Sequence, residues 1–163
     1  MSGNVRGDAS GAASSDAAGG MSGAVFVTRR HIDALAAHAA VGAAMRQAVE
    51  LGVAVNIAVV DGAGLLVAFA RMNGAFLHSA DIAIDKAYTA AGFGFGTGEW
   101  DRVLDGASES VRRGLMQRPR LVGFGGGVPI RIEGEVIGAI GVSGGSEAQD
   151  EACAEAGIAA LVG

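Results

Sequence analysis

Two short turns, each lying between two apolar runs rich in β-branched residues, constrain the fold more than any other feature of this sequence. The first turn, Asp61–Gly64, joins residues 53–60 to residues 65–70. The second, Glu133–Glu135, lies within residues 128–142. Strands joined by tight turns pair antiparallel, because the turn reverses the direction of the chain. The sequence therefore predicts two hairpins and a mainly antiparallel sheet.

Helical periodicity is found on both sides of these hairpins. It predicts a helix from Thr28, as the N-cap, to Leu51, and further helices over residues 79–91, 99–116 and 146–161. Residues 121–124 are expected to form a short strand. The expected order is α-β-β-α-α-β-β-β-α, which is typical of an α+β fold with about five strands and helices packed against the sheet.

Length and composition indicate one domain with a tail. The chain has 163 residues, half of them hydrophobic, which is enough for a single core. Residues 1–24 are almost entirely Gly, Ala, Ser and Asp, so we expect a disordered N-terminal tail before a domain over residues 25–163. Cys153 is the only cysteine, which excludes an internal disulfide and agrees with a reducing compartment.

Charge and hydropathy argue against two classes of partner. The formal charge is −5, and no run of Lys and Arg matches the cluster of cations that a nucleic acid or an anionic membrane surface requires. No apolar stretch reaches the roughly 18 residues of a membrane span, and the N-terminus lacks the pattern of a secretory signal. We expect a cytoplasmic protein that binds neither nucleic acid nor membrane.

Three segments carry a family resemblance: residues 59–75, 79–90 and 126–151. They contain Val-Val-Asp-Gly-Ala-Gly-Leu with Arg-Met-Asn-Gly-Ala, then Ser-Ala-Asp-Ile-Ala-Ile-Asp-Lys-Ala-Tyr-Thr-Ala, then Gly-Gly-Val-Pro-Ile with Ile-Gly-Ala-Ile-Gly-Val-Ser-Gly and Gln-Asp-Glu. In order and spacing they resemble the GlcG/HbpS-like "haem-degrading" family, which includes the C-terminal domain of PduO-type proteins. The resemblance implies a profilin-like sheet of about five strands, homo-oligomers that are often octamers, and binding of haem or a corrinoid.

Two positions depart from the family pattern, and both lie in the loop before residue 79. Asn73 stands where the family has aspartate, and His78 stands where it usually has a small residue. His78 is the strongest candidate for chemistry, as a ligand of haem iron or as an acid or base. A solvent-exposed histidine with no role is the alternative. His31 and His38 are seven residues apart, too far for one metal, and we expect both at the surface.

Cations and glycines complete the candidate site. Arg71 could bind a carboxylate or propionate through two hydrogen bonds, or form a surface ion pair. Lys86 occupies an almost fixed family position and could pair with a substrate carboxylate or with an acidic partner inside the fold. Gly126 and Gly127 could expose N–H groups to an anion, although a tight turn explains them more simply.

Two functions are the leading hypotheses, and a purely structural or regulatory subunit that needs only its oligomer interface is a third. The first is an oligomeric binding protein for haem, another tetrapyrrole or a carboxylated ligand, with His78 on the iron and Arg71 or Lys86 on the propionates. The second is a cofactor-free isomerase, hydratase or lyase acting on a small organic acid, in which His78 is the acid or base and Arg71, Asn73 and Lys86 orient the substrate. The sequence contains no Ser-His-Asp elbow, zinc quartet or redox Cys pair.

Overall fold

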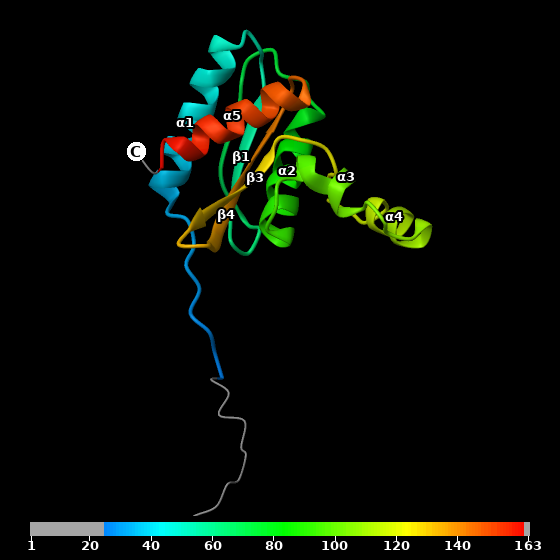
Figure 1. The fold of residues 1–163 in the computed structure, drawn as a ribbon. Helices are drawn as coiled ribbons and strands as arrows, with labels where there is room; N and C mark the ends of the chain where they lie inside the picture. The colour runs from blue at the N-terminus through cyan, green and yellow to red at the C-terminus, as the bar shows by residue number, and fades with distance from the viewer. Residues whose placement is uncertain (1–24, 162–163) are drawn as a thin grey trace, which may run out of the picture.

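The computed structural model describes residues 25–161, and the expected tail over residues 1–24 lies outside the described residues. One sheet with helices on both faces forms the body (Figure 1), which confirms the α+β class. In chain order the elements are α1 (Ala34–Glu50), β1 (Asn56–Asp61), β2 (Leu66–Arg71), α2 (Ser79–Phe93), the 3-10 turn η1 (Thr97–Glu99), α3 (Trp100–Val103), α4 (Glu109–Met116), β3 (Gly127–Ile132), β4 (Glu135–Ser143) and α5 (Glu147–Ala159).

The sheet has the order β2-β1-β4-β3, and every neighbouring pair is antiparallel. Both predicted hairpins, β1–β2 and β3–β4, are therefore confirmed. The expected count of about five strands is wrong, since the described residues form four. Residues 121–124 are not a strand because Val122 donates its backbone N–H to the side chain of Thr89 on α2. This contact ties the segment to a helix instead of to a neighbouring strand.

Local chemistry closes the two turns. In the first, the Oδ1 atom of Asp61 accepts hydrogen bonds from the backbone N–H groups of Ala63, at 2.8 Å, and Leu65, at 3.0 Å. In the second, Glu133 and Gly134 have φ values of 51° and 82°. Two consecutive positive φ values characterise the type I′ turn, whose twist matches that of the flanking strands.

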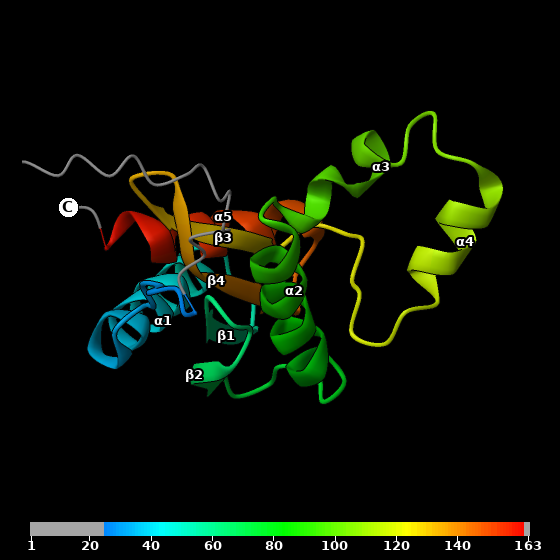
Figure 2. The same cartoon turned by 90° about the horizontal axis from the view of Figure 1, so that it is seen from below.

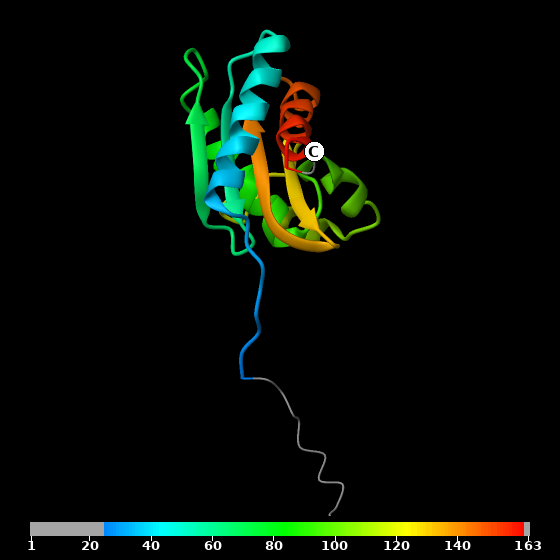
Figure 3. The same cartoon turned by 90° about the vertical axis from the view of Figure 1, so that its left-hand side faces the viewer.

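Side chains alternate between two cores along each central strand, as the period of a β-strand requires. On β1, Ile57 and Val59 face α1 and α5, whereas Ala58 and Val60 face α2. Figure 3 shows α1 and α5 together in front of the sheet, and Figure 2 shows α2 on the opposite side. Helix α2 comes so close to β4 that any side chain at Gly141 would collide with the helix backbone. Small residues thus set the distance between α2 and the sheet.

The first helix begins later than predicted. It starts at Ala34, and its N-cap is Asp33, whose Oδ1 accepts the N–H of Leu35 at 2.8 Å. The choice of Thr28 as N-cap was wrong because a carboxylate nearer to the apolar periodicity satisfies the first free N–H groups of the helix. Residues 25–33 precede the helix without regular structure.

The predicted helix over residues 99–116 is broken into α3 and α4. Gly106, with φ of 78°, lies in the turn between them, and Ser108 caps the start of α4 by accepting the N–H of Val111. We call residues 100–121 the arm, because this segment projects from the body on the side of α2 (Figure 2). Helix α4 buries none of its residues. No helix within residues 25–161 is long and apolar enough to cross a membrane.

Candidate functional site

Lys86 lies at the centre of the body, on the face of α2 that packs against β4. Its side chain is only 1% exposed, and Nζ donates to the carbonyl oxygen of Val142 and to Oδ2 of Asp150, both at 2.8 Å. The ring of Phe124 lies 4.8 Å from the same nitrogen, within cation–π range. Burial lowers the pKa of Lys86 because it removes water from the charged amine, and the hydrogen bond with Asp150 opposes this shift.

Gly126 and Gly127 pack directly around this lysine. A Cβ atom at Gly126 would lie 2.7 Å from the Nζ atom of Lys86, and one at Gly127 would lie 2.5 Å from the carbonyl oxygen of the same residue. The N–H of Gly127 donates to the Oγ1 atom of Thr97 at 2.9 Å. Close approach to Lys86 therefore requires glycine at both positions, whereas the sequence suggested a tight turn as the simpler explanation. Lys86, Gly126 and Gly127 therefore lie together. The amine of Lys86 and the N–H of Gly127 both already have hydrogen-bond partners within the protein.

Arg71, Asn73 and His78 form a second group, on the loop between β2 and α2. Arg71 ends β2 and donates from Nη2 to the carbonyl oxygen of Ala75 at 3.1 Å, which holds the loop in a closed bend. Asn73 is exposed. This group shares no hydrogen bond with Lys86, which lies two turns beyond His78 on α2. The structure therefore divides the predicted site into a buried centre and a surface loop.

His78 occupies the N-cap position of α2 and is exposed, and its imidazole makes no capping hydrogen bond. Within the described residues, both ring nitrogens lack a hydrogen-bond partner, which leaves them free for a ligand. The two preceding side chains are apolar and exposed: Phe76 to 69% and Leu77 to 75%. An uncommitted imidazole thus stands beside a small apolar surface.

Asn56 is not among the site residues predicted from the sequence, but its side chain holds the same loop through a hydrogen bond. Asn56 begins β1 opposite Arg71 of β2, is fully buried, and donates from Nδ2 to the carbonyl oxygen of Phe76 at 3.0 Å. Its Oδ1 atom has no partner among the described residues. A polar residue at the start of an otherwise apolar run was the pattern that could have pointed to it, because a buried amide needs a partner.

The other two histidines lie away from this loop. His31 is exposed and places Nδ1 3.5 Å from a carboxylate oxygen of Asp61, and His38 is exposed on α1. No cluster of three or more potential metal ligands occurs among residues 25–161. Cys153 is buried on α5, and burial raises the pKa of its thiol to about 11, so it is an unreactive packing residue.

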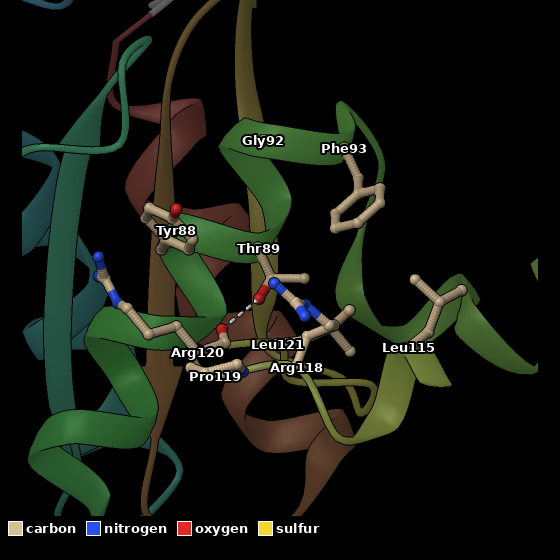
Figure 4. Close-up of a pocket in the computed structure, with 9 residues that line it drawn as sticks. All are labelled: Tyr88, Thr89, Gly92, Phe93, Leu115, Arg118, Pro119, Arg120 and Leu121. Atoms are coloured by element: carbon tan, nitrogen blue, oxygen red, sulfur yellow. Dashed lines mark hydrogen bonds between the residues drawn. The ribbon is translucent and has the colours of Figure 1, made fainter. Parts of the chain in front are cut away.

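A cavity of about 570 Å³ opens between α2 and the end of the arm (Figure 4). Its lining contains Tyr88, Thr89, Gly92 and Phe93 from α2, and Leu115 with residues 118–121 from the arm. None of the residues proposed from the sequence lies in this lining. The pattern that could have found it is local: residues 112–120 contain four arginines and no acidic residue, in a chain of net charge −5.

The antiparallel sheet, the flanking helices and the glycine contacts around Lys86 define an α+β domain of the type that the motifs implied. The family described as "Haem degrading protein HbpS-like" matches residues 32–159, and this chain belongs to that family. Among solved structures, the fold is similar to protein ORFY of Klebsiella pneumoniae, with a TM-score of 0.79 and 32% identity over 85% of this chain and 96% of that one. It is also similar to a double mutant of HbpS from Streptomyces reticuli, with a TM-score of 0.76 and 33% identity over 92% and 98% of the two chains.

A third solved structure is described as a PduOC:Heme complex, and it has a TM-score of 0.72 and 34% identity over 80% of this chain and 94% of that one. Among curated proteins, GlcG of Escherichia coli is 36% identical over 66% of this chain and 77% of its own length. The corrinoid adenosyltransferase PduO of Citrobacter freundii is 36% identical over 76% of this chain. The match spans only 37% of PduO, so this chain corresponds to about a third of that protein.

Proposed function

We propose that this protein binds haem, or a related tetrapyrrole with carboxylate side chains, at the surface formed by Arg71, Phe76, Leu77 and His78. The observation that carries the proposal is the uncommitted imidazole of His78, exposed at the start of α2. The likeness to a structure solved as a haem complex supports the choice of ligand.

The donor set on this loop fits haem. His78 would hold the iron through a ring nitrogen, since imidazole is a common axial ligand. Phe76 and Leu77 offer exposed apolar side chains that a porphyrin ring would cover. Arg71 uses one N–H for the carbonyl oxygen of Ala75, which leaves four guanidinium donors for a propionate. Bound haem would supply a redox-active iron, and the residues of this loop would set its position and polarity.

Self-association belongs to the same proposal. The loop adjoins β2, an edge strand with exposed apolar side chains at Leu66 and Phe69. A flat ligand on an open surface keeps one face in water, whereas a second copy of the chain would cover that face and the apolar edge together. We propose that the haem-bound form is a homo-oligomer.

Haemin titration of the purified protein tests the ligand and the residue. We expect a saturable shift of the Soret band in the wild type and at least a tenfold loss of affinity in His78→Ala, because the axial ligand is removed. His38→Ala is the matched control, since that histidine is also exposed but lies on α1. An identical titration for His78→Ala and wild type would reject the site, and the absence of any saturable shift would reject the function.

A further inference from the structure

We propose that the cavity between α2 and the arm is a second ligand site, which binds a monocarboxylate with an aromatic or branched apolar body. This site is separate from the loop that carries His78. It rests on the walls of the cavity, on the contacts that hold those walls, and on one arginine that has no partner within residues 25–161.

The walls of the cavity are mainly apolar. A volume of about 570 Å³ is within the usual range for small-molecule sites. Phe93 forms one wall, and its ring is held edge-on against Trp100, with centroids 4.8 Å apart. Because Trp100 is itself buried, Phe93 cannot turn into the cavity without breaking this contact. Leu115 and Leu121 face it from the arm (Figure 4).

Hydrogen bonds from α2 fix the backbone of residues 120–122, of which Arg120 and Leu121 line the cavity. The Oγ1 atom of Thr89 donates to the carbonyl oxygen of Arg120 at 2.9 Å and accepts the N–H of Val122 at 3.1 Å. Arg120 has φ of 66°, a left-handed conformation that is uncommon for a residue with a side chain. Such backbone strain persists only where surrounding contacts enforce it, and it is frequent at ligand sites.

The two arginines that line the cavity differ in their hydrogen bonds and ion pairs. Arg120 donates from Nε to Asp85 at 2.8 Å, and its guanidinium lies 3.7 Å above the ring of Tyr88. Arg118 also lines the cavity, but its guanidinium has no hydrogen bond or ion pair within residues 25–161. Figure 4 draws the Arg118 side chain among the residues that line the cavity.

This arrangement selects the class of ligand. A single free guanidinium matches one carboxylate, which it binds through two parallel hydrogen bonds. No acidic residue lines the cavity, and the nearby carboxylate of Asp85 is paired with Arg120. A polyphosphate would need several cations or N–H groups, whereas the remaining surface offers aromatic and aliphatic side chains. The ligand is therefore an anion at one end and apolar along its body.

Phenylacetate is a suitable probe, with calorimetry or ligand-observed NMR as the measurement. We expect saturable binding of one molecule per chain, and at least a tenfold weaker affinity in Arg118→Gln. Arg113→Gln is the matched control, because Arg113 is on the same arm but pairs with Glu109 outside the cavity. The neutral analogue 2-phenylethanol should bind weakly and equally to the wild type and to Arg118→Gln.

Several results would overturn the inference. Phenylacetate that fails to saturate at millimolar concentration excludes the site, and equal affinity in wild type and Arg118→Gln excludes the arginine. Leu115→Glu is a second variant, which places a carboxylate in the cavity from an exposed helix and should abolish binding of the anion without unfolding the body. His78→Ala should bind phenylacetate normally, which separates this site from the haem proposal. Displacement of phenylacetate by haemin would instead assign the cavity to the tetrapyrrole.

Discussion

Two ion pairs of nearly equal length show how differently the body and the arm are built. In the body, Lys86 and Asp150 are 2.8 Å apart, and their side chains are 1% and 4% exposed. On the arm, Arg113 and Glu109 are 2.9 Å apart, but 75% and 72% exposed. Removal of one partner from the buried pair leaves the other charge without a counter-charge or water. Removal of one partner from the exposed pair leaves the other charge hydrated by solvent.

The surroundings of each pair extend this contrast. Asp150 also accepts the N–H of Gly145 at 2.8 Å through its other oxygen, so one carboxylate on α5 binds both α2 and the turn between β4 and α5. Helix α4 has eight residues and none of them is buried. A helix this short is marginal by itself in water, so packing does not define its place as it does for α2. The body is held by interlocking buried contacts, whereas α4 has no buried residue that fixes its position.

The largest effect is expected in Asp150→Asn. The amide keeps the size of the side chain and its acceptor for Gly145, but leaves the amine of Lys86 without a counter-charge. We expect a loss of about 3–5 kcal/mol in the free energy of unfolding, the usual cost of breaking a buried pair. Urea denaturation followed by circular dichroism measures it.

Lys86→Met and the double variant Lys86→Met/Asp150→Asn complete a double-mutant cycle. Because the double variant buries no charge, its loss should be clearly smaller than the sum of the two single losses. Additive losses, or a change below about 1 kcal/mol in Asp150→Asn, would contradict a tightly coupled centre.

The same contrast separates what the sequence could predict from what it could not. Turn chemistry is local, so Asp61 and Gly134 were enough to place both hairpins correctly. The partner of Lys86 is 64 positions away, and only the folded chain shows which acid it meets. The break in the arm depends on Gly106 and Ser108, whose effect competes with weak helical periodicity over the whole segment. Similarly, the exposure of His78 is decided by how Asn56 and Arg71 hold its loop.

A smaller effect on the stability of the body is expected when the pH of the solution is raised. Cys153 lies one turn after Asp150 on α5, and burial raises the pKa of its thiol from 9.0 to about 11. Between these values the unfolded thiol has lost its proton while the folded thiol keeps it, so deprotonation favours the unfolded chain. This group should remove on the order of 1–2 kcal/mol of stability as the pH rises from about 9 to 11.

Cys153→Ala isolates this contribution. The pKa of Lys86 is lowered in the folded state, so that group changes stability in the opposite direction over the same range. Since Lys86 is present in both proteins, its contribution cancels when their urea midpoints are compared at pH 8 and pH 10.5. Cys153→Ala should lose less stability than the wild type between the two pH values. Parallel pH profiles would show that the thiol is not buried in solution.

The smallest effect is expected in Arg113→Gln on the arm. Its ion pair is exposed and joins residues one turn apart on a short helix, an arrangement worth about 0.3–0.5 kcal/mol. The free energy of unfolding, which reports on the cooperative body, should change by less than about 0.5 kcal/mol. The same urea titration used for Asp150→Asn measures both on one scale. A loss of several kcal/mol here would mean that α4 is packed against another surface in solution, and the arm would then have to be regarded as part of an interface between chains.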